Sequence, residues 1–200
     1  MFDTNSLKSQ VANRGGFAFT GKYLVSFLNT PTRLGYVPSK LLSMTCENTS
    51  LPTRSIQASE KLIYGTSYQM PYKHAYGEIS MTFYLTKDMS AKKMFDRWLN
   101  LIVDPVSGDL GYYENYTCDI NVAMFGKNIG NPGESSATAD YAVKLIRAWP
   151  SIVAEVALTH SGGADIAKLP VTFQYKKWEE SSWPVSGAPA GYYAGSANAS

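Results

Sequence analysis

Strict alternation of apolar and polar residues constrains the fold of this chain more than any other feature of its sequence. In residues 78–86 every second residue is apolar: Ile79, Met81, Phe83 and Leu85. A period of two is typical of a strand with one buried and one exposed face. Similar patterns occupy 116–124 and 169–176, and less regular ones occupy 22–28, 54–64, 141–148 and 153–159. The alternation therefore predicts a mainly β protein.

One segment, residues 90–102, has a helical period instead. Its apolar residues fall on a single stripe: Met94, Phe95, Trp98, Leu99 and Ile102. Asp88 or Ser90 can cap the start of this helix, and Asp104-Pro105 can end it. We expect a β-sandwich or barrel-like fold with this one amphipathic helix packed on the sheets and the five stripe residues in its core.

The ends of the chain differ from its middle. Two hundred residues suffice for one domain. Residues 1–20 are polar and interrupted by glycine, which indicates an N-terminal arm. Residues 181–200 carry no charge, and fifteen of the twenty are Ser, Ala, Gly or Pro, which predicts a flexible tail. The β domain is therefore expected at 21–180, with long loops at 30–53 and 125–139.

Charge is scarce for a soluble domain. Charged residues make up 17% of the chain, where about 25% is usual. The net charge of +2 gives no support to an electrostatic nucleic-acid site, which needs a clustered basic face. This composition is typical of a subunit that neighbouring subunits bury on several sides.

The sequence shows no recognisable catalytic or metal-binding pattern. Cys46 and Cys118 match no metal spacing and are predicted to be reduced and packed. His74 and His160 stand far apart in turn-like sequence. We therefore expect no enzyme, no metal and no cofactor. The chain has no signal-peptide pattern and no apolar stretch long enough to span a membrane, so we expect it to stay in a cytoplasm.

Several segments together resemble the tail tube protein of contractile-tailed bacteriophages. The helix contributes a Phe-x-x-Trp motif at Phe95 and Trp98. The similarity covers about residues 20–180 and is carried, in order, by 51–56, 64–65, 78–83, 93–100, 112–116, 148–152 and 169–175. Each motif is weak alone, and the succession of seven makes the resemblance fairly specific.

The resemblance implies a structural virion protein rather than an enzyme. Its subunits would form hexameric rings that stack into the inner tail tube, a conduit for DNA ejection inside a contractile sheath. The implied partners are further copies of the chain, the tail sheath protein, the tape measure and baseplate proteins, with no membrane. Viral DNA would pass through the lumen without specific binding. The protein would be located in the virion tail after assembly in the bacterial host cytoplasm.

A channel for DNA has its own chemical requirements. It should not bind phosphates through lysine or arginine, and it should not stack on bases through aromatic rings. Polar strand faces meet these requirements, and they predict these lumen-lining residues: Ser55, Gln57, Ser59, Lys61, Ser80, Thr82, Asp119 and Asn121. Lys61 and Lys144 would be exceptions, for which an acidic partner such as Glu60 or Glu78 is expected. The arm and the loops 30–53 and 125–139 are candidates for contacts between rings.

Other readings of the sequence stay open. The chain can be the main tube subunit, a baseplate tube initiator or the tube subunit of a secretion system. It can also be a carbohydrate- or receptor-binding β-sandwich, because 14 tyrosines and four tryptophans suit such a module.

Overall fold

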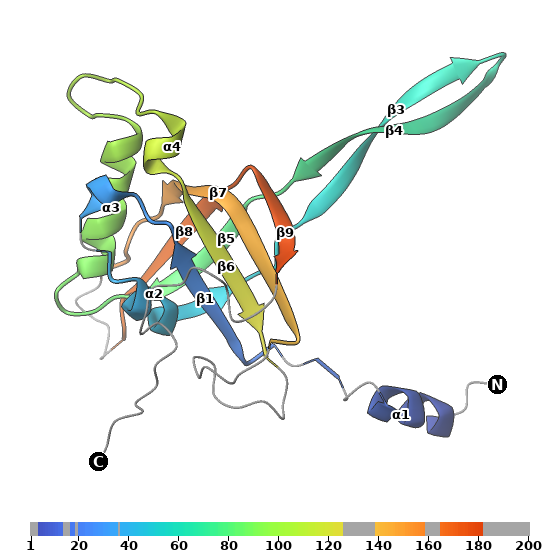
Figure 1. Ribbon diagram of the computed structural model, residues 1–200, viewed down its shortest axis with the longest axis horizontal. Helices are drawn as coiled ribbons and strands as arrows, with labels where there is room; N and C mark the ends of the chain where they lie inside the picture. Colours follow the sequence, from blue (N-terminus) through green and yellow to red (C-terminus); the bar gives the residue numbers. More distant parts are fainter. Residues whose placement is uncertain are drawn as a thin grey trace.

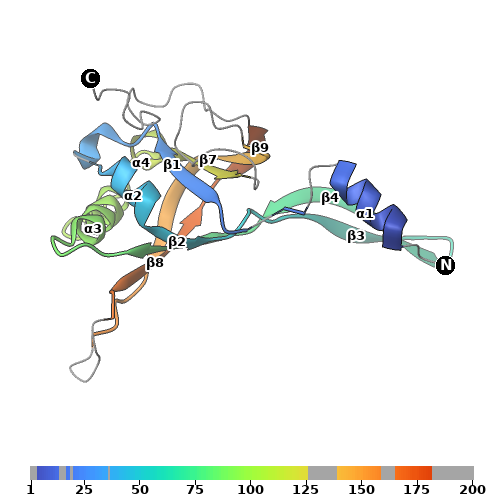
Figure 2. The same cartoon turned by 90° about the horizontal axis from the view of Figure 1, so that it is seen from below.

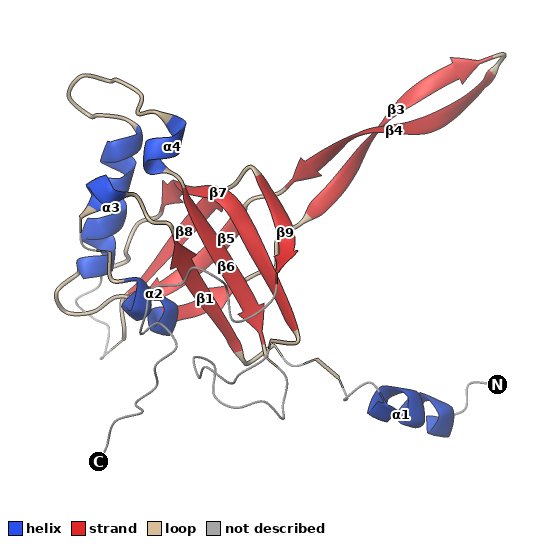
Figure 3. Ribbon diagram, viewed as in Figure 1, coloured by secondary structure: helices blue, strands red, loops and turns tan. Residues whose placement is uncertain are grey.

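Strands dominate the computed structural model, which describes residues 4–13, 17–18, 20–35, 37–125, 139–158 and 165–181. The strands within these residues are β1 (Tyr23–Leu28), β2 (Cys46–Thr49), β3 (Arg54–Ile63), β4 (Thr66–Tyr76), β5 (Ile79–Tyr84), β6 (Cys118–Met124), β7 (Tyr141–Val153), β8 (Lys168–Gln174) and β9 (Lys177–Ser181). The helices are α1 (Thr4–Asn13), α2 (Ser39–Thr45), α3 (Ser90–Ile102) and α4 (Tyr113–Tyr116), with a 3-10 helix, η1, at Thr32–Leu34. The prediction of a mainly β fold is confirmed (Figure 3).

Most of the strands form one sheet that folds over on itself as two layers (Figure 1). The first layer contains β1, β6, the first part of β7, and β9. The second contains β2, β5 and β8, and the end of β7 pairs with β8. β7 therefore belongs to both layers, which explains its length of 13 residues. The result is a sandwich whose two layers are joined through one strand.

The core lies between these layers and beneath α3. Ile79, Met81 and Phe83 on β5 are fully buried, and their apolar period of two reflects that burial. On α3, Met94, Phe95, Trp98 and Ile102 are buried, and Leu99 is half-buried. The rings of Phe95 and Trp98 stack with centroids 6.2 Å apart, and Phe95 also meets Phe83 at 5.5 Å. The helix thus closes one end of the sandwich with an aromatic cluster.

Asp119 holds the corner where β7 passes from one layer to the other. Arg147, at this corner, has a φ of 55°, in the left-handed region that a non-glycine residue seldom occupies. Its backbone N–H donates to Asp119 Oδ1 at 3.1 Å, and Lys144 Nζ lies 2.9 Å from Asp119 Oδ2. Asn29 Nδ2 donates to the same carboxylate at 3.2 Å. One carboxylate therefore joins β1, β6 and β7.

Replacing Asp119 by alanine is expected to lower the free energy of unfolding by about 1–3 kcal/mol, because the substitution leaves a backbone donor and a half-buried ammonium without their acceptor. The matched control is Glu114→Ala, which removes an exposed ion pair to Arg147 and should change stability by less than about 0.5 kcal/mol. Urea unfolding followed by tryptophan fluorescence measures both. Equal effects of the two variants would contradict the structural role of Asp119.

Three expectations from the sequence are corrected by the structure. The chain has further helices besides α3. Segment 30–53 is not an open loop, because η1, α2 and β2 lie within it and Leu34 and Leu42 anchor it in the core. Residues 153–159 do not form a separate strand, since β7 ends at Val153 and residues 154–158 are irregular. The loop 125–139 and the tail 181–200 lie almost wholly outside the described residues.

The start of α3 also differs from expectation. Met89, with a φ of 55°, occupies the position before the helix and makes no side-chain cap. Thr86 Oγ1 donates to the Asp88 carboxylate, which also accepts from the backbone N–H of Ser90, and these hydrogen bonds lower the Asp88 pKa. Asp88 therefore satisfies one helix N–H from outside the helix.

Candidate channel and assembly surfaces

The outer face of the second layer is a small polar surface. Ser80 and Thr82 alternate with the buried residues of β5 and point away from the core. Thr172 on β8 is opposite Ser80, and Asn48 on β2 is opposite Thr82. Ser151 Oγ donates to the Thr172 carbonyl oxygen at 3.1 Å, which ties β7 into the same surface. We call Asn48, Ser80, Thr82 and Thr172 the polar sheet face.

Charged side chains near this face are neutralised or hydrogen-bonded. Lys168 forms an ion pair with Glu47, and its ammonium lies 5.4 Å from the centroid of the Tyr84 ring. The hydrogen bond from Lys168 lowers the pKa of Glu47, and the hydrogen bond to Glu47 raises the pKa of Tyr84. Gln174 Nε2 donates to Glu78. The polar sheet face therefore offers no unpaired cation of its own to a phosphate.

A long hairpin, β3–β4, projects from the edge of this layer (Figures 1 and 2). It continues the β2–β5 pair outward, because Gly77 N–H donates to the Thr53 carbonyl oxygen at 3.2 Å, just before β3 begins. Beyond its base, the described side chains of the hairpin are exposed on both faces, and its strands pair only with each other among the described strands. A long unpaired edge of this kind is a ready site for pairing with another chain.

Contacts at the base of the hairpin fix the direction of its two faces. Arg54 lies over the Trp178 ring, 4.9 Å from its centroid, and Tyr76 meets Tyr175 at 6.1 Å, so these residues face the core. Strand residues alternate in direction, so Ser55 and Gln57 point away from the core. They share this orientation with Ser80 and Thr82. Four of the predicted lumen-lining residues therefore point away from the core: Ser55, Gln57, Ser80 and Thr82.

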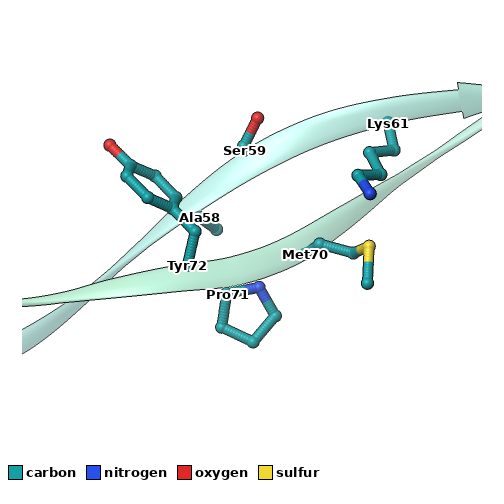
Figure 4. A pocket seen from close by; sticks show the side chains of 6 residues that line it. All are labelled: Ala58, Ser59, Lys61, Met70, Pro71 and Tyr72. Carbon is teal, nitrogen blue, oxygen red and sulfur yellow. The ribbon is translucent and has the colours of Figure 1, made fainter.

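β4 adds residues that the sequence-based prediction missed. Gln57 is opposite Lys73, Ser59 is opposite Met70, and Lys61 is opposite Tyr68. A bulge inserts Tyr72, whose hydroxyl donates to Gln57 Oε1 at 3.1 Å. Figure 4 shows Tyr72, Met70 and Lys61 around this part of the hairpin. β4 therefore adds Lys73 in the inner half of the hairpin and the bulky residues Tyr68, Met70 and Tyr72 farther out.

β4 is not among the predicted strands, because Pro71 argues against a strand. Aromatic and apolar residues do alternate along it, at Tyr68, Met70, Tyr72 and Tyr76, although nearly all of its side chains are exposed. Proline is tolerated here because the edges of the hairpin are free, so an N–H is not required on the outer side. The hairpin has two signs in the sequence: the strand predicted at 54–64, which is β3, and Tyr64-Gly65, which forms its turn with both residues at positive φ.

Asp119 and Asn121 lie elsewhere, on β6 in the first layer. Asn121 is fully buried, and its Oδ1 accepts from Ser181 Oγ at 3.0 Å, so the prediction that it faces a channel is wrong for this structure. Asp119 belongs to the β7 corner. The expected acidic partner of Lys144 exists, but it is Asp119 rather than Glu60 or Glu78. Lys61 forms no ion pair with any described residue.

The N-terminal arm contains a helix, α1, that lies away from the two layers of the sandwich in both views (Figures 1 and 2). A helix of ten residues has marginal stability in water without packing, because the free-energy cost of nucleating it exceeds the stabilisation from so few hydrogen bonds. The arm is therefore available for contact with another molecule.

Neither cysteine has the properties of a nucleophile. Both are free thiols, Cys118 buried and Cys46 half-buried. Burial raises the pKa of Cys46 to about 12 and raises the pKa of Cys118 well above its ordinary value. No group of three or more metal-binding side chains occurs within the described residues. None of the described helices is long and apolar enough to cross a membrane.

These thiols make stability fall at high pH. The unfolded chain loses thiol protons from about pH 9, whereas the folded chain retains them to about pH 12. The unfolded state then binds fewer protons, so the free energy of unfolding decreases as pH rises through this window. Burial of Tyr23, whose hydroxyl donates to the Cys46 carbonyl oxygen at 3.0 Å, acts in the same direction.

Urea titrations at several pH values between 8 and 11 measure this effect, with Cys46→Ser as the control that removes part of it. The folded protein should also react slowly with a thiol reagent at pH 8, and the unfolded protein quickly. A free energy of unfolding that stays constant above pH 9 would contradict the assignment.

Comparison with known proteins gives one family. The family model described as phage tail tube protein matches residues 17–181. No curated protein sequence matches the chain.

Similar solved structures come from contractile injection systems. A chain of the sheath-tube complex of an extracellular contractile injection system, PVC, in its extended state has a TM-score of 0.58 at 14% identity, covering 91% of this chain and 99% of that one. A chain of the baseplate of the anti-feeding prophage (AFP) has a TM-score of 0.58 at 12% identity, covering 84% and 98%. A chain of the PVC sheath/tube terminator reaches 0.56 at 15% identity, covering 82% and 95%. At these identities the likeness shows a shared fold.

Proposed function

The chain belongs to the phage tail tube protein family, a family of structural tube proteins, and from this we propose that it forms hexameric rings that stack into the inner tube of a contractile tail. The tube would conduct DNA during ejection, inside a sheath and between a baseplate and the head. The protein would act as a structural component of the virion tail, assembled in the host cytoplasm, rather than as an enzyme.

The observation that carries this proposal is the combination of a polar sheet face with a long unpaired hairpin beside it. The hairpin buries none of its described side chains beyond its base, so a monomer gains little from it. β1 and β2, at the two ends of the strand order, each pair with one described strand. Contacts between two different surfaces of identical subunits produce rings when they close and filaments when they do not. A tube needs both kinds of contact.

We place Ser55, Gln57, Ser80 and Thr82 on the channel wall. They point away from the core and are small or uncharged, and the nearby Lys168 is paired with Glu47. Lys73, opposite Gln57, forms no ion pair with a described residue. DNA would meet few cations and few flat rings there, which favours passage over binding. Ser59 and Lys61 lie farther out, beside Met70 and Tyr68, and we assign that half of the hairpin to contacts between subunits.

Cryo-electron microscopy of the assembled tube tests both the tube and its wall. The expected result is a hollow tube of stacked six-fold rings with the polar sheet face toward the lumen. Ser80 and Thr82 on the outer wall would contradict the assignment of the wall and leave the tube itself standing. If the purified protein forms no tubes at high concentration, and none when a preformed baseplate is added, the proposed function is contradicted.

Deleting residues 1–16 is expected to leave the domain folded and to abolish long tubes. The family match begins at residue 17, and α1 lies apart from the sheets, so the melting temperature should change little. Thermal unfolding and negative-stain electron microscopy of the same sample measure both properties. Tubes of normal length from the truncated chain would show that the arm has no role in stacking.

Two related functions have specific support. The similarity to a baseplate chain of the anti-feeding prophage, determined with 6-fold symmetry, favours a baseplate tube initiator. The similarity to the PVC sheath-tube complex favours the tube of an injection or secretion system instead of a phage tail. Imaging of intact particles that contain the protein distinguishes them, because a tail tube is attached to a DNA-filled head and an initiator occurs only next to the baseplate.

A further inference from the structure

Two exposed apolar surfaces lie on opposite sides of the molecule. One is the outer half of the β3–β4 hairpin, which we call the hairpin tip, where Leu62, Tyr64, Tyr68 and Met70 are exposed. The other is the loop of residues 103–112 between α3 and α4, which we call the α3–α4 loop, where Val106, Leu110 and Tyr112 are 94%, 72% and 83% exposed. Both views place the hairpin and α3 at opposite sides of the sheets (Figures 1 and 2).

Hydrogen bonds hold the α3–α4 loop in one shape despite its exposed apolar side chains. Asp104 N–H donates to the Asp109 carbonyl oxygen at 3.0 Å, and Gly108 N–H donates to the Asp104 carbonyl oxygen at 2.8 Å. The Asp104 carboxylate accepts from Val106 N–H at 2.8 Å. Gly111 lets the chain return along α3, because a Cβ there would lie 2.6 Å from the Leu101 carbonyl oxygen. An ordered apolar surface of this kind is typical of a binding site.

The two surfaces carry complementary charges at one place. The hairpin tip, residues 60–70, contains Lys61 and Glu60, which as neighbours on β3 point to opposite faces. The loop, residues 103–112, contains Asp104 and Asp109 and no basic residue, which gives −2. Complementary charge of this kind orients a contact and excludes like-charged partners.

We propose that the hairpin tip of one copy docks on the α3–α4 loop of another copy, with Lys61 facing the two aspartates of the loop. The occupant is a second copy because one chain carries both apolar surfaces, on sides too far apart to meet within it. Lys61 on one surface and Asp104 and Asp109 on the other form no ion pair with a described residue. The contact joins two different surfaces, so it repeats from subunit to subunit. The proposal rests on the proposed tube function, for which it supplies a specific contact.

Disulfide trapping tests the contact directly. One preparation carries Tyr64→Cys and another carries Leu110→Cys, and the two are mixed and oxidised under assembly conditions. The control mixture replaces Leu110→Cys by Leu158→Cys, an equally exposed leucine outside both surfaces. We expect the disulfide between positions 64 and 110, identified by mass spectrometry of the linked peptides, to exceed the control by about tenfold, because docking raises the local concentration. Equal yields would overturn the proposal.

Charge reversal gives a second, independent measurement. Lys61→Glu and Asp109→Lys are each expected to raise the protein concentration needed for assembly by about tenfold, and the double variant to return it to within about twofold of the original. A double variant no better than the worse single variant would overturn the pairing. Both substitutions are at exposed positions, and circular dichroism confirms that each variant is folded.

Electron microscopy of the unsubstituted chain under the same assembly conditions distinguishes a failure of this contact from a failure of the tube function. If tubes form and the 64–110 disulfide does not, the contact is wrong and the tube stands. If the disulfide forms without rings or tubes, the contact stands and the tube function fails. If neither forms, both fail.

Discussion

Replacing Trp98 by alanine is expected to cost about 3–5 kcal/mol of stability, the usual cost of emptying a large aromatic site in a core. Trp98 is fully buried, stacks on Phe95 and meets Phe173 edge-on at 6.4 Å. Its Nε1 also donates to the Tyr116 carbonyl oxygen at 2.6 Å, which fixes α4 against α3. Alanine therefore removes ring contacts and leaves a buried carbonyl without its donor. Urea unfolding measures the loss.

The variant Trp98→Phe separates these two contributions. Phenylalanine keeps an aromatic ring next to Phe95 but cannot donate to the Tyr116 carbonyl, so a loss of about 1–3 kcal/mol is expected, clearly smaller than that of alanine. Leu99→Ala, on the half-buried edge of the same stripe, should also cost less than Trp98→Ala. Nearly equal stability of Trp98→Ala and the original chain would contradict the placement of α3 over the core.

Removing the β3–β4 hairpin is expected to abolish assembly while the domain stays folded. Ser55 and Ala75 lie opposite each other in the ladder, so residues 56–74 can be replaced by Asn-Gly, which suits a two-residue hairpin turn. The contacts of Arg54 with Trp178 and of Tyr76 with Tyr175 remain. Because the removed side chains do not contribute to the core, the melting temperature should shift by only a few degrees.

Sedimentation velocity and negative-stain electron microscopy of the shortened chain measure the loss of rings and tubes. The matched control is the full-length chain with Leu158→Ser. This substitution alters an exposed leucine outside the hairpin and should leave assembly unchanged. Normal tubes from the shortened chain would exclude the hairpin from every essential contact. Unfolding of the shortened chain would show instead that the hairpin stabilises the domain.

The sequence predicted those elements of the fold that have one buried face. β5 and β8 alternate because each covers the core on one side, and α3 has a helical stripe for the same reason. Burial of one face therefore leaves a period of apolar residues in the sequence, and this period can be recognised without a structure. The family also follows from sequence, since its motifs lie in these elements and in the turns between them.

Elements without such a face could not be predicted. β4 is exposed on both sides, β2 and β9 are only four and five residues long, and α2 is anchored mainly by Leu42. β2, β9 and α2 carry no pattern long enough to distinguish them from a loop, and Pro71 interrupts the alternation of β4. Their positions are set by pairing with strands that are distant in the sequence.

The sequence by itself determined which side chains of a strand point the same way, because successive residues of a strand alternate. Only the tertiary structure decided which of these faces share a surface. Ser55, Ser80 and Thr82 point away from the core, whereas Asn121, equally polar and equally alternating, is buried in the other layer. The reason is that a period of two shows that one face of a strand is buried but does not show which element buries it. That element is brought there by pairing between strands that are distant in the sequence.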